Sequence, residues 1–477
     1  MPVTRRAARA AARQAAAALL LEPPTEIVAH ILKHCQLTDF CSLMRTCKQL
    51  QPAVEGALRL RADEAGHHLP KKLAEETSCR ARVHQLLQLE RRRKQLTRRT
   101  IAAGMSHSLF ISKAGELLSC GTEWDVDGNP TPGLLGHGEL AEEDVPASSI
   151  HVPTLIPTLR GIKIRSVAAG VSLSLAVTEE GEVYSWGQGN MGQLGHGWTT
   201  HGQSTPRPIV ALKDERIVAV EAGFIHALAL TAEGKVFSWG AGGDGRLGHG
   251  TEDHQAEPKV VKMLEGKNIR SIAAGYESSL ALTSEGRVLS WGRGALGQLG
   301  HGSCASELEP RFIEALKDQP ISAITAGNKR SLALARDGAV LSWGDGAGGQ
   351  LGHGDETHLQ IPQRIRALAG LDIAQVVAGA SHSFALTSDG VLYSWGAGQC
   401  GRLGHGNEEK QLVPKRVEAL EGICIIAVAG GAFHSVAADE YGAVYGWGDG
   451  DGASLGLELH SDQLEPRRYP NNLRVAL

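Results

Sequence analysis

Seven copies of one sequence unit follow one another from about residue 98 to the end of the chain. A Trp-Gly pair recurs in six of them, and successive tryptophans lie 53, 52, 52, 52 and 52 residues apart. They are Trp186, Trp239, Trp291, Trp343, Trp395 and Trp447, and Cys120 holds the same place in the first unit. A glycine recurs at an equivalent position in all seven units: Gly104, Gly170, Gly223, Gly275, Gly327, Gly379 and Gly431. A repeat this regular predicts a fold built from one small structural unit used seven times.

Each unit has the composition of a small β-sheet. In the fourth unit, the runs SLALT and RVLSW are of β type, and the turn signal Ser284–Gly286 between them predicts a hairpin. The Gly-rich run after each tryptophan predicts a shaped loop. A unit this small cannot bury both faces of its sheet alone, so the units must form a closed ring or an open stack. We expect a mainly-β, seven-bladed β-propeller, in which the repeated tryptophans anchor the core between blades.

The pattern AAG…HSLALT…GxVYSWGxGxxGQLGHG resembles the regulator-of-chromosome-condensation repeat, and the tryptophan is followed by Gly rather than preceding an Asp as in WD repeats. The resemblance covers about residues 98–470 and implies a propeller domain over residues 98–477. Because the repeats begin near Ile101 and end near the EPRRYP stretch, we expect the terminal strands to share one blade and close the ring.

Six histidines occupy one place in the repeat, the LGHG run. They are His137, His196, His249, His301, His353 and His405. Each falls in a different unit, so they cannot converge on one metal ion. We expect a structural role in the loop, and the sequence predicts neither a metal site nor a cofactor.

The two residues after each repeated glycine vary most between copies, so the frame does not dictate them. Because they occupy one equivalent place in every blade, they would ring one face of the propeller. Aromatic side chains there are of the kind that dominate binding hot spots. The candidate binding residues are Phe224, Ile225, Tyr276, Glu277, Asn328, Lys329 and Phe433. Ordinary surface variation is the alternative.

The first unit is longer than the others by about thirteen residues, since Cys120 precedes Trp186 by 66 positions against 53 for the next pair. The extra residues fall around 124–153 and include the acids Glu139, Glu142, Glu143 and Asp144. A long loop on a rigid scaffold is a functional candidate, and a tolerated insertion explains it equally well.

Residues 21–60 contain no repeat and carry two helical stripes of apolar residues, within 27–32 and 40–47. Pro23 and Pro24 mark the start of the first helix. This stretch resembles an F-box, the helical module that docks onto the Skp-type adaptor of cullin-based ubiquitin ligases. The resemblance implies that the adaptor is bound by Pro23, Pro24, Ile27, Ile31, Leu32, Leu37, Phe40, Leu43 and Cys47. Leu50 stands where an aromatic is common. A small helical cap packed on the propeller is the alternative.

Two further segments flank this module. Residues 1–20 are rich in Arg and Ala, which is typical of a disordered leader and also of a transit peptide. Residues 61–97 have helical spacing and contain the basic run Arg91–Lys94. A solvated connecting helix explains that run, and a nuclear-import or nucleic-acid patch is the sharper alternative.

Composition narrows the class of protein. The net charge of −4 argues against nonspecific electrostatic binding of nucleic acid by the chain as a whole, except through the basic linker. The eight cysteines include no CxxC pair, which argues against a zinc finger or a disulfide framework and favours an intracellular compartment. No apolar run approaches the roughly 18 residues that span a bilayer.

The sequence therefore predicts a protein-binding adaptor rather than an enzyme. The first hypothesis is a substrate receptor of a Skp–cullin–F-box ubiquitin ligase, with the adaptor–cullin complex as partner and an unknown protein target on the propeller face. The second is a guanine-nucleotide exchange factor for a small GTPase, the activity of the founding member of the repeat family. The third is a chromatin-associated or general protein-interaction scaffold.

Overall fold

The computed structural model describes residues 99–123, 133–138, 149–198, 202–450, 453–457, 461–470 and 473–476. All of them belong to the unit Gln95–Leu477. The predicted leader, the F-box-like module and the basic linker lie outside the described residues, as do the acids Glu139, Glu142, Glu143 and Asp144.

The described chain forms seven four-stranded antiparallel sheets, called blades 1 to 7 in chain order. Blade 1 contains β1 (Ile101–Ala103), β2 (His107–Ile111), β3 (Leu117–Thr122) and β4 (Ser149–Leu155). Blades 2 and 3 contain β5 (Ile164–Ala169), β6 (Leu173–Thr178), β7 (Val183–Gly187), β8 (Gln203–Pro208), β9 (Ile217–Ala222), β10 (His226–Thr231), β11 (Val236–Gly240) and β12 (Gln255–Val260).

Blades 4 and 5 contain β13 (Ile269–Ala274), β14 (Ser278–Thr283), β15 (Val288–Gly292), β16 (Glu307–Phe312), β17 (Ile321–Ala326), β18 (Arg330–Ala335), β19 (Val340–Gly344) and β20 (Leu359–Arg364). Blades 6 and 7 contain β21 (Ile373–Ala378), β22 (His382–Thr387), β23 (Leu392–Gly396), β24 (Gln411–Arg416), β25 (Ile425–Gly430), β26 (His434–Asp439), β27 (Val444–Gly448) and β28 (Gln463–Arg468).

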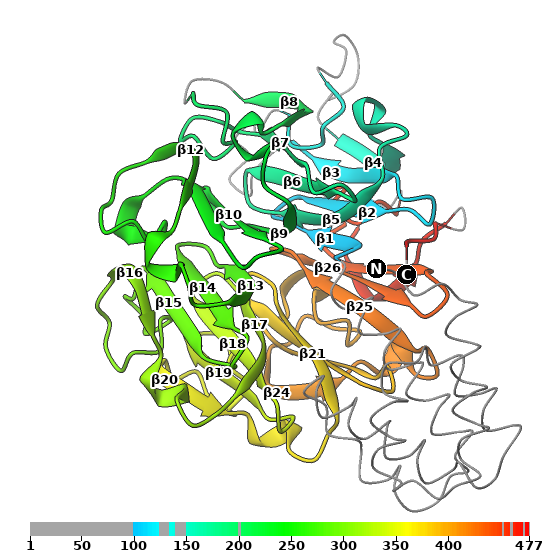
Figure 1. Ribbon diagram of the computed structural model, residues 1–477. Coiled ribbons are helices and arrows are strands. Elements are labelled where there is room, and N and C mark those ends of the chain that lie inside the picture. The colour runs from blue at the N-terminus through cyan, green and yellow to red at the C-terminus, as the bar shows by residue number, and fades with distance from the viewer. Residues whose placement is uncertain are drawn as a thin grey trace, which may run out of the picture. The chain divides into compact units, whose positions relative to one another are not determined.

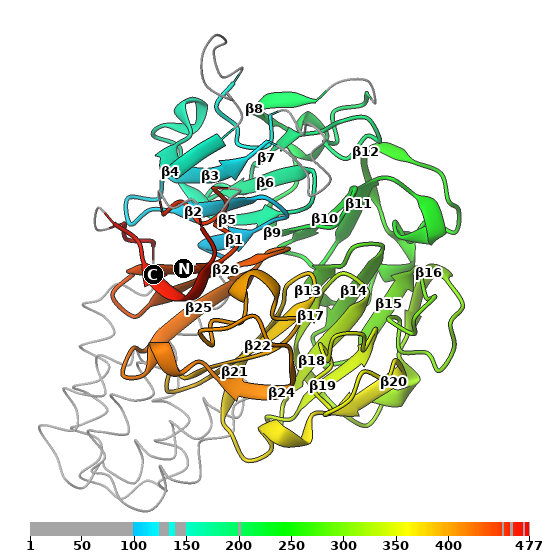
Figure 2. The ribbon, with the colours of Figure 1, turned by 180° about the vertical axis from the view of Figure 1, so that it is seen from behind.

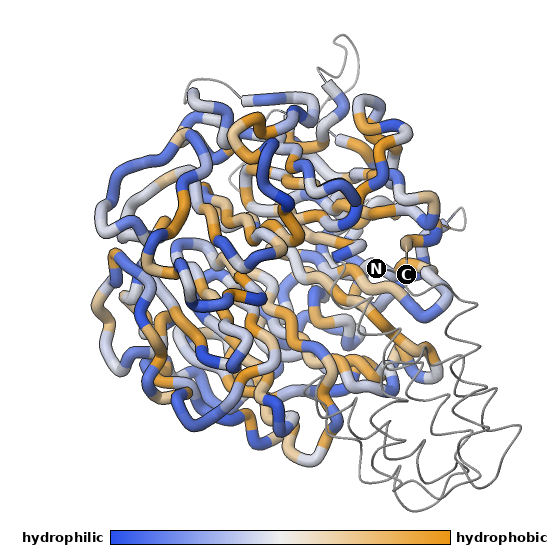
Figure 3. Tube along the Cα trace, in the orientation of Figure 1, coloured by the Kyte–Doolittle hydropathy of each residue, from blue (hydrophilic) through white to orange (hydrophobic). Residues whose placement is uncertain are grey.

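The hydrophobic core lies between neighbouring blades. The second strand of a blade is buried along its whole length, as in β10 and β14, because another blade covers each of its faces. One cluster joins Leu175 of blade 2 to Val220 and Trp239 of blade 3. Figure 3 shows hydrophobic residues along the strands and hydrophilic residues in the connecting loops. The seven-bladed, mainly-β propeller predicted from the repeat is confirmed.

Backbone hydrogen bonds join each blade to the next around a complete ring. The residue after each repeated glycine donates its N–H to a carbonyl of the following blade: Met105 to Gly170, Val171 to Gly223, Phe224 to Tyr276, Tyr276 to Gly327, Asn328 to Ala380, Ala380 to Gly431 and Ala432 to Gly104. The last bond, of 3.1 Å, closes blade 7 on blade 1. Figures 1 and 2 show β1 beside β25 and β26 from both sides.

The expectation that terminal strands share one blade is wrong. Every blade consists of four consecutive strands, because β28 supplies the outer strand of blade 7 from its own repeat. Instead, the final residues tie the ring across its closing seam. Val475 pairs with Ser112 of blade 1, and Arg474 pairs with Ala443 of blade 7.

The six repeated tryptophans lie in the seams between blades, and each is fully buried. Five donate their indole N–H to a carbonyl of the preceding blade at 2.8–3.0 Å: Trp186 to Leu134, Trp239 to Gln193, Trp291 to Arg246, Trp395 to Gln350 and Trp447 to Arg402. The Nε1 of Trp343 has no hydrogen-bond partner among the described residues.

The LGHG histidines stay within their own blades. His196 Nε2 lies 3.0 Å from Ser185 Oγ, and that hydroxyl donates to Leu194 O at 2.7 Å, so the histidine nitrogen is the donor. The same pairing joins His137 to Ser119, His249 to Ser238, His301 to Ser290, His353 to Ser342 and His405 to Ser394. Each histidine thereby fixes the end of its Gly-rich loop to the third strand of the blade.

A second set of histidines opens the second strand of four blades and is fully buried in the seams. His226 Nε2 donates to Ser279 Oγ of the next blade at 3.0 Å, since that hydroxyl itself donates to Arg246 O. The equivalent pairs are His107 with Ser174, His382 with Ser435 and His434 with Ser108. Arg330 takes this place in blade 5 and donates from its guanidinium to Ser383 Oγ and Ala380 O.

Blade 4 has no such link. Ser278 stands at the histidine position, and neither its buried Oγ nor Trp343 Nε1 in the same seam has a hydrogen-bond partner in the described chain. The equivalent acceptor is nevertheless in place, because Ser331 Oγ of blade 5 donates to Gln298 O and has room to accept. The seam between blades 4 and 5 is therefore less completely bonded than the histidine seams.

We expect Ser278→His to stabilise the propeller. The imidazole would pack on Gly275 as His226 packs on Gly223, and its Nε2–H would donate to Ser331 Oγ. One such hydrogen bond contributes about 1 kcal/mol. Urea unfolding at pH 8 should show a higher midpoint for this variant than for the wild type, while Ser278→Ala should not. A lower midpoint for Ser278→His would contradict the equivalence of the seams.

Acidification should destabilise the propeller through the seam histidines. Burial lowers the pKa of His107 and of His226 to about 3, and a nearby charge adds to the effect, from His434 and Arg246 respectively. Burial, with Arg402 nearby, lowers the pKa of His434 to about 4. The unfolded chain, with histidine pKa values near 6.5, binds protons first, so stability is lost as pH falls from about 6.5 towards 4. His226→Leu, which copies Leu173 of blade 2, should make this loss less steep. Unfolding free energies measured from pH 8 to pH 5 test this; equal slopes for the two proteins would contradict it.

Candidate functional site

One end of the propeller carries the residues that vary between repeats. The residue after each Trp-Gly pair donates its N–H to the carbonyl of the second variable residue, as Arg293 does to Glu277 O at 3.0 Å. The same bond joins Ala241 to Ile225 and Asp449 to Phe433. The inner turns and the Gly-rich loops therefore lie side by side at one end of every blade. We call this end, made of those turns and loops, the loop face.

The structure places all seven predicted binding residues on the loop face, in four different blades. Lys329 is exposed and the other six are half-buried: Phe224, Ile225, Tyr276, Glu277, Asn328 and Phe433. Phe224 of blade 3 and Tyr276 of blade 4 come together, with ring centroids 4.0 Å apart and planes at 11°. Phe433 stands apart from them in blade 7.

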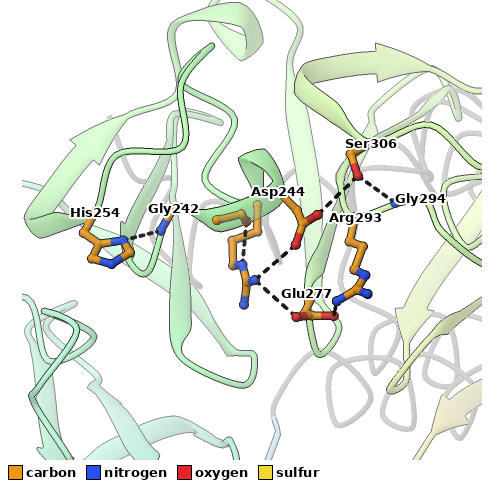
Figure 4. Close-up of polar contacts among 9 residues, drawn as sticks. Gly242, Asp244, His254, Glu277, Arg293, Gly294 and Ser306 are labelled. Carbon is orange, nitrogen blue, oxygen red and sulfur yellow. Dashed lines mark hydrogen bonds and ion pairs between the residues drawn. The ribbon is translucent and has the colours of Figure 1, made fainter.

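A charged network lies next to this aromatic pair, across the seam between blades 3 and 4. The Glu277 carboxylate accepts from Arg293 Nη1 at 2.9 Å and from Arg246 Nη2 at 3.3 Å (Figure 4). Arg246 Nη2 also lies 3.7 Å from Asp244 Oδ2. Ser306 Oγ of blade 4 donates to Asp244 Oδ1 at 3.4 Å. Blade 3 therefore supplies an arginine that fixes a variable residue of blade 4.

Blade 6 holds Phe433 of blade 7 in the same way. The Arg402 guanidinium lies 4.3 Å from the centroid of the Phe433 ring, and Nη1 donates to Ala432 O at 2.8 Å. Cys400 stands two residues earlier. Burial, with Asp462 and Asp449 nearby, raises its pKa to about 11, so it is a neutral thiol at pH 7 rather than a reactive thiolate.

Sequence reasoning missed Arg246 and Arg402. Their signal is a single letter, since these two loops read Gly-Arg-Leu-Gly where three others read Gly-Gln-Leu-Gly. The glutamines turn back into their own loops, as Gln193 does in accepting from Met191 N at 2.9 Å. The arginines are longer and reach the inner turn of the next blade.

The loop face carries many exposed acids. Glu252, Asp253, Asp355, Glu356, Glu408 and Glu409 are exposed in the loops of blades 3, 5 and 6. Of the cations beside them, Arg293 is paired with Glu277 and Lys410 with Glu356. The face therefore offers exposed carboxylates around a ring of half-buried, partly aromatic turns.

One serine has the spacing of a hydrolase nucleophile, in the run Gly-Ala-Ser-Leu-Gly at residues 452–456. Ser454 is 1% exposed, and its hydroxyl donates to Asp449 O at 3.2 Å. It replaces the glutamine or arginine of the repeat loop, so its place is structural. No cluster of three or more His, Cys, Asp or Glu able to hold a metal ion occurs in the part of the chain that the structure describes. The described residues also include no helix that is long and apolar enough to cross a membrane.

Comparison with known proteins agrees with this architecture. Residues 197–476 match the RCC1-like domain, and residues 164–193 match the regulator of chromosome condensation (RCC1) repeat. The chain belongs to the RCC1 repeat family.

Members of the RCC1 repeat family differ in what surrounds the propeller. The chain is 37% identical to the ultraviolet-B receptor UVR8 of Arabidopsis thaliana over 77% of this chain and 80% of UVR8. It is 40% identical to the E3 ubiquitin-protein ligase HERC2 of Homo sapiens over 74% of this chain. The matched region covers only 7% of the length of HERC2. The crystal structure of Prp20p from Saccharomyces cerevisiae, described with its binding to Gsp1p and histones, superposes with a TM-score of 0.65 at 26% identity, covering 80% of this chain and 89% of Prp20p.

The ion pair between Arg246 and Glu277 should be energetically coupled in this RCC1 repeat protein, because the two side chains are only 6% and 16% exposed. We expect Glu277→Gln to destabilise the wild type more than it destabilises Arg246→Gln, since removing one partner leaves a charge buried and underpaired. A double-mutant cycle by urea unfolding should give a coupling of about 0.5–3 kcal/mol. Additive effects of the two substitutions would show that the contact is not a functional pair.

Proposed function

We propose that this RCC1 repeat protein is a substrate receptor of a Skp–cullin–F-box ubiquitin ligase. Residues 21–60 would dock onto the Skp-type adaptor, and the loop face would hold the protein target. The chain itself would carry out no chemistry. Ubiquitin transfer would be promoted by proximity, because a tethered target has a high effective concentration at the transfer site.

The observation that carries the proposal is the F-box-like pattern joined in one chain to a propeller. The apolar positions from Ile27 to Cys47 match the adaptor-binding pattern, and they belong to no repeat. The similarity to HERC2 adds support, since HERC2 is an E3 ubiquitin-protein ligase that contains related sequence. On the loop face, Phe224, Tyr276 and Phe433 are not required by the repeated frame, because other copies have Val, Ala or Ser in these places.

A nucleotide exchange factor is the second candidate, and the likeness to Prp20p favours it. Prp20p is described with its binding to Gsp1p, and its fold covers 80% of this chain. An exchange factor would act by binding the nucleotide-free GTPase more tightly than the loaded form. It would not need an adaptor, which separates the two candidates experimentally.

An affinity capture experiment tests the first proposal. The intact chain, expressed in cells, should co-purify with the Skp-type adaptor and a cullin, and Phe40→Ala with Leu43→Ala should abolish this. The matched control, Phe224→Ala with Tyr276→Ala, should retain adaptor and cullin because it alters only the loop face. Failure of the intact chain to capture the adaptor would overturn the proposal, and nucleotide release from small GTPases would then be measured.

A further inference from the structure

The Gly-rich loops of blades 3 and 6 share four features that set them apart. Each has arginine in place of glutamine, Arg246 or Arg402. Each contains a 3-10 turn, η5 (Gly243–Gly245) or η9 (Gln399–Gly401), whose central residue is left-handed, with φ of 56° at Asp244 and 59° at Cys400. Each arginine reaches the inner turn of the next blade.

The fourth shared feature is an exposed acidic pair, Glu252–Asp253 in blade 3 and Glu408–Glu409 in blade 6. The two pairs occupy equivalent places. A Cβ at Gly242 would lie 2.0 Å from Asp253 O, and a Cβ at Gly398 would lie 2.2 Å from Glu409 O. In blades 4, 5 and 7, the residues at this contact are Ala305, Thr357 and Ser461, and in blade 5 the exposed acids Asp355 and Glu356 precede it.

We propose that these features form two equivalent docking corners for a basic protein segment. Corner A consists of the Phe224–Tyr276 pair, Arg246 and the acids Glu252 and Asp253. Corner B consists of Phe433, Arg402 and the acids Glu408 and Glu409. The corners lie three blades apart on the loop face. The inference rests on the proposed function for calling the bound protein a ubiquitination target, but its binding chemistry is independent of the adaptor.

The chemistry of the corners selects the partner. Half-buried aromatic rings fixed by neighbouring groups are suited to an apolar or cationic side chain, because they offer area without losing conformational freedom. The exposed carboxylates attract Lys or Arg and repel acidic segments. Each corner therefore fits a short stretch in which an apolar residue is flanked by basic residues.

The arginines are positioning residues, not ligands for the basic groups. Arg246 forms ion pairs with Glu277 and Asp244, and the Arg402 guanidinium lies against the Phe433 ring. Each guanidinium keeps one buried nitrogen, Nη1 of Arg246 and Nη2 of Arg402, for which the described residues provide no acceptor.

Two corners on one rigid face make the binding bivalent. A ligand that reaches both corners gains from the effective concentration of its second arm, so avidity should exceed the affinity of one arm by roughly 100-fold. The test uses a fluorescent peptide with two Lys-Leu-Lys triplets joined by a long Gly/Ser linker, a one-triplet peptide, and a two-triplet peptide with Glu in place of Lys.

Fluorescence anisotropy with the purified full-length chain measures binding in the absence of adaptor. We expect the two-triplet basic peptide to bind most tightly. Two variants disable corner B and leave corner A intact: Phe433→Ala, and Glu408→Gln with Glu409→Gln. Each should lower the affinity for the two-triplet peptide to that of the one-triplet peptide. Phe224→Ala with Tyr276→Ala should do the same through corner B. Arg402→Gln should weaken binding without changing exposed charge, as a positioning role requires.

The matched control is Glu233→Gln with Glu265→Gln, which removes two exposed acids from turns at the other end of blades 3 and 4. This variant should bind as the wild type does. The proposal is overturned if the control weakens binding as much as the corner variants, if the one-triplet and two-triplet peptides bind alike, or if the acidic peptide binds as well as the basic one. Because no adaptor is present, these outcomes are distinct from failure of the adaptor capture.

Discussion

The close contact between inner turns of neighbouring blades is the constraint on which the rest of the structure depends. At Gly223 a Cβ would lie 2.3 Å from the His226 ring and 2.6 Å from Gly275 O, so only glycine fits. This absence of a side chain allows the backbone of one blade to bond to the next, seven times around the ring. The tryptophan and the seam histidine then fill and bond the same junction further out. The position that repeats most strictly is therefore the one that closes the ring.

Because this contact is made by backbone atoms, the residues next to the repeated glycine can differ from blade to blade. The N–H of Phe224 and of Asn328 makes the same inter-blade bond, although one side chain is aromatic and the other polar. Because backbone atoms make the ring, the side chains that follow the glycine can vary without loss of closure. The same separation explains why the loop arginines are tolerated. The carbonyl of Arg246 accepts from Trp291, as that of Gln193 accepts from Trp239, so the exchange of glutamine for arginine leaves the seam bond intact.

The sequence was informative wherever a contact repeats with the period of the chain. Seven units, the β-hairpin in each and one shared face for the variable residues all follow from spacing. Contacts that occur once were not accessible in the same way. The pairing of Val475 with Ser112 joins residues more than 350 positions apart and ends the chain differently from a shared strand. The Phe224–Tyr276 stack and the Arg402–Phe433 contact also depend on which blade faces which. For Arg402, a one-letter change in a loop was the only sign in the sequence.

The buried histidines of the propeller serve as structural links between its blades. The seam histidines donate from Nε2 to a serine, and their Nδ1 atoms lack a partner among the described residues, so protonation would place an unmatched donor in the seam. Burial accordingly keeps them neutral at pH 7, where they act as fixed links rather than proton carriers. The loop face carries exposed carboxylates set around half-buried aromatic rings. A rigid ring with a charged, partly aromatic face is suited to hold a partner in one orientation, which is what the proposed receptor acting by proximity requires.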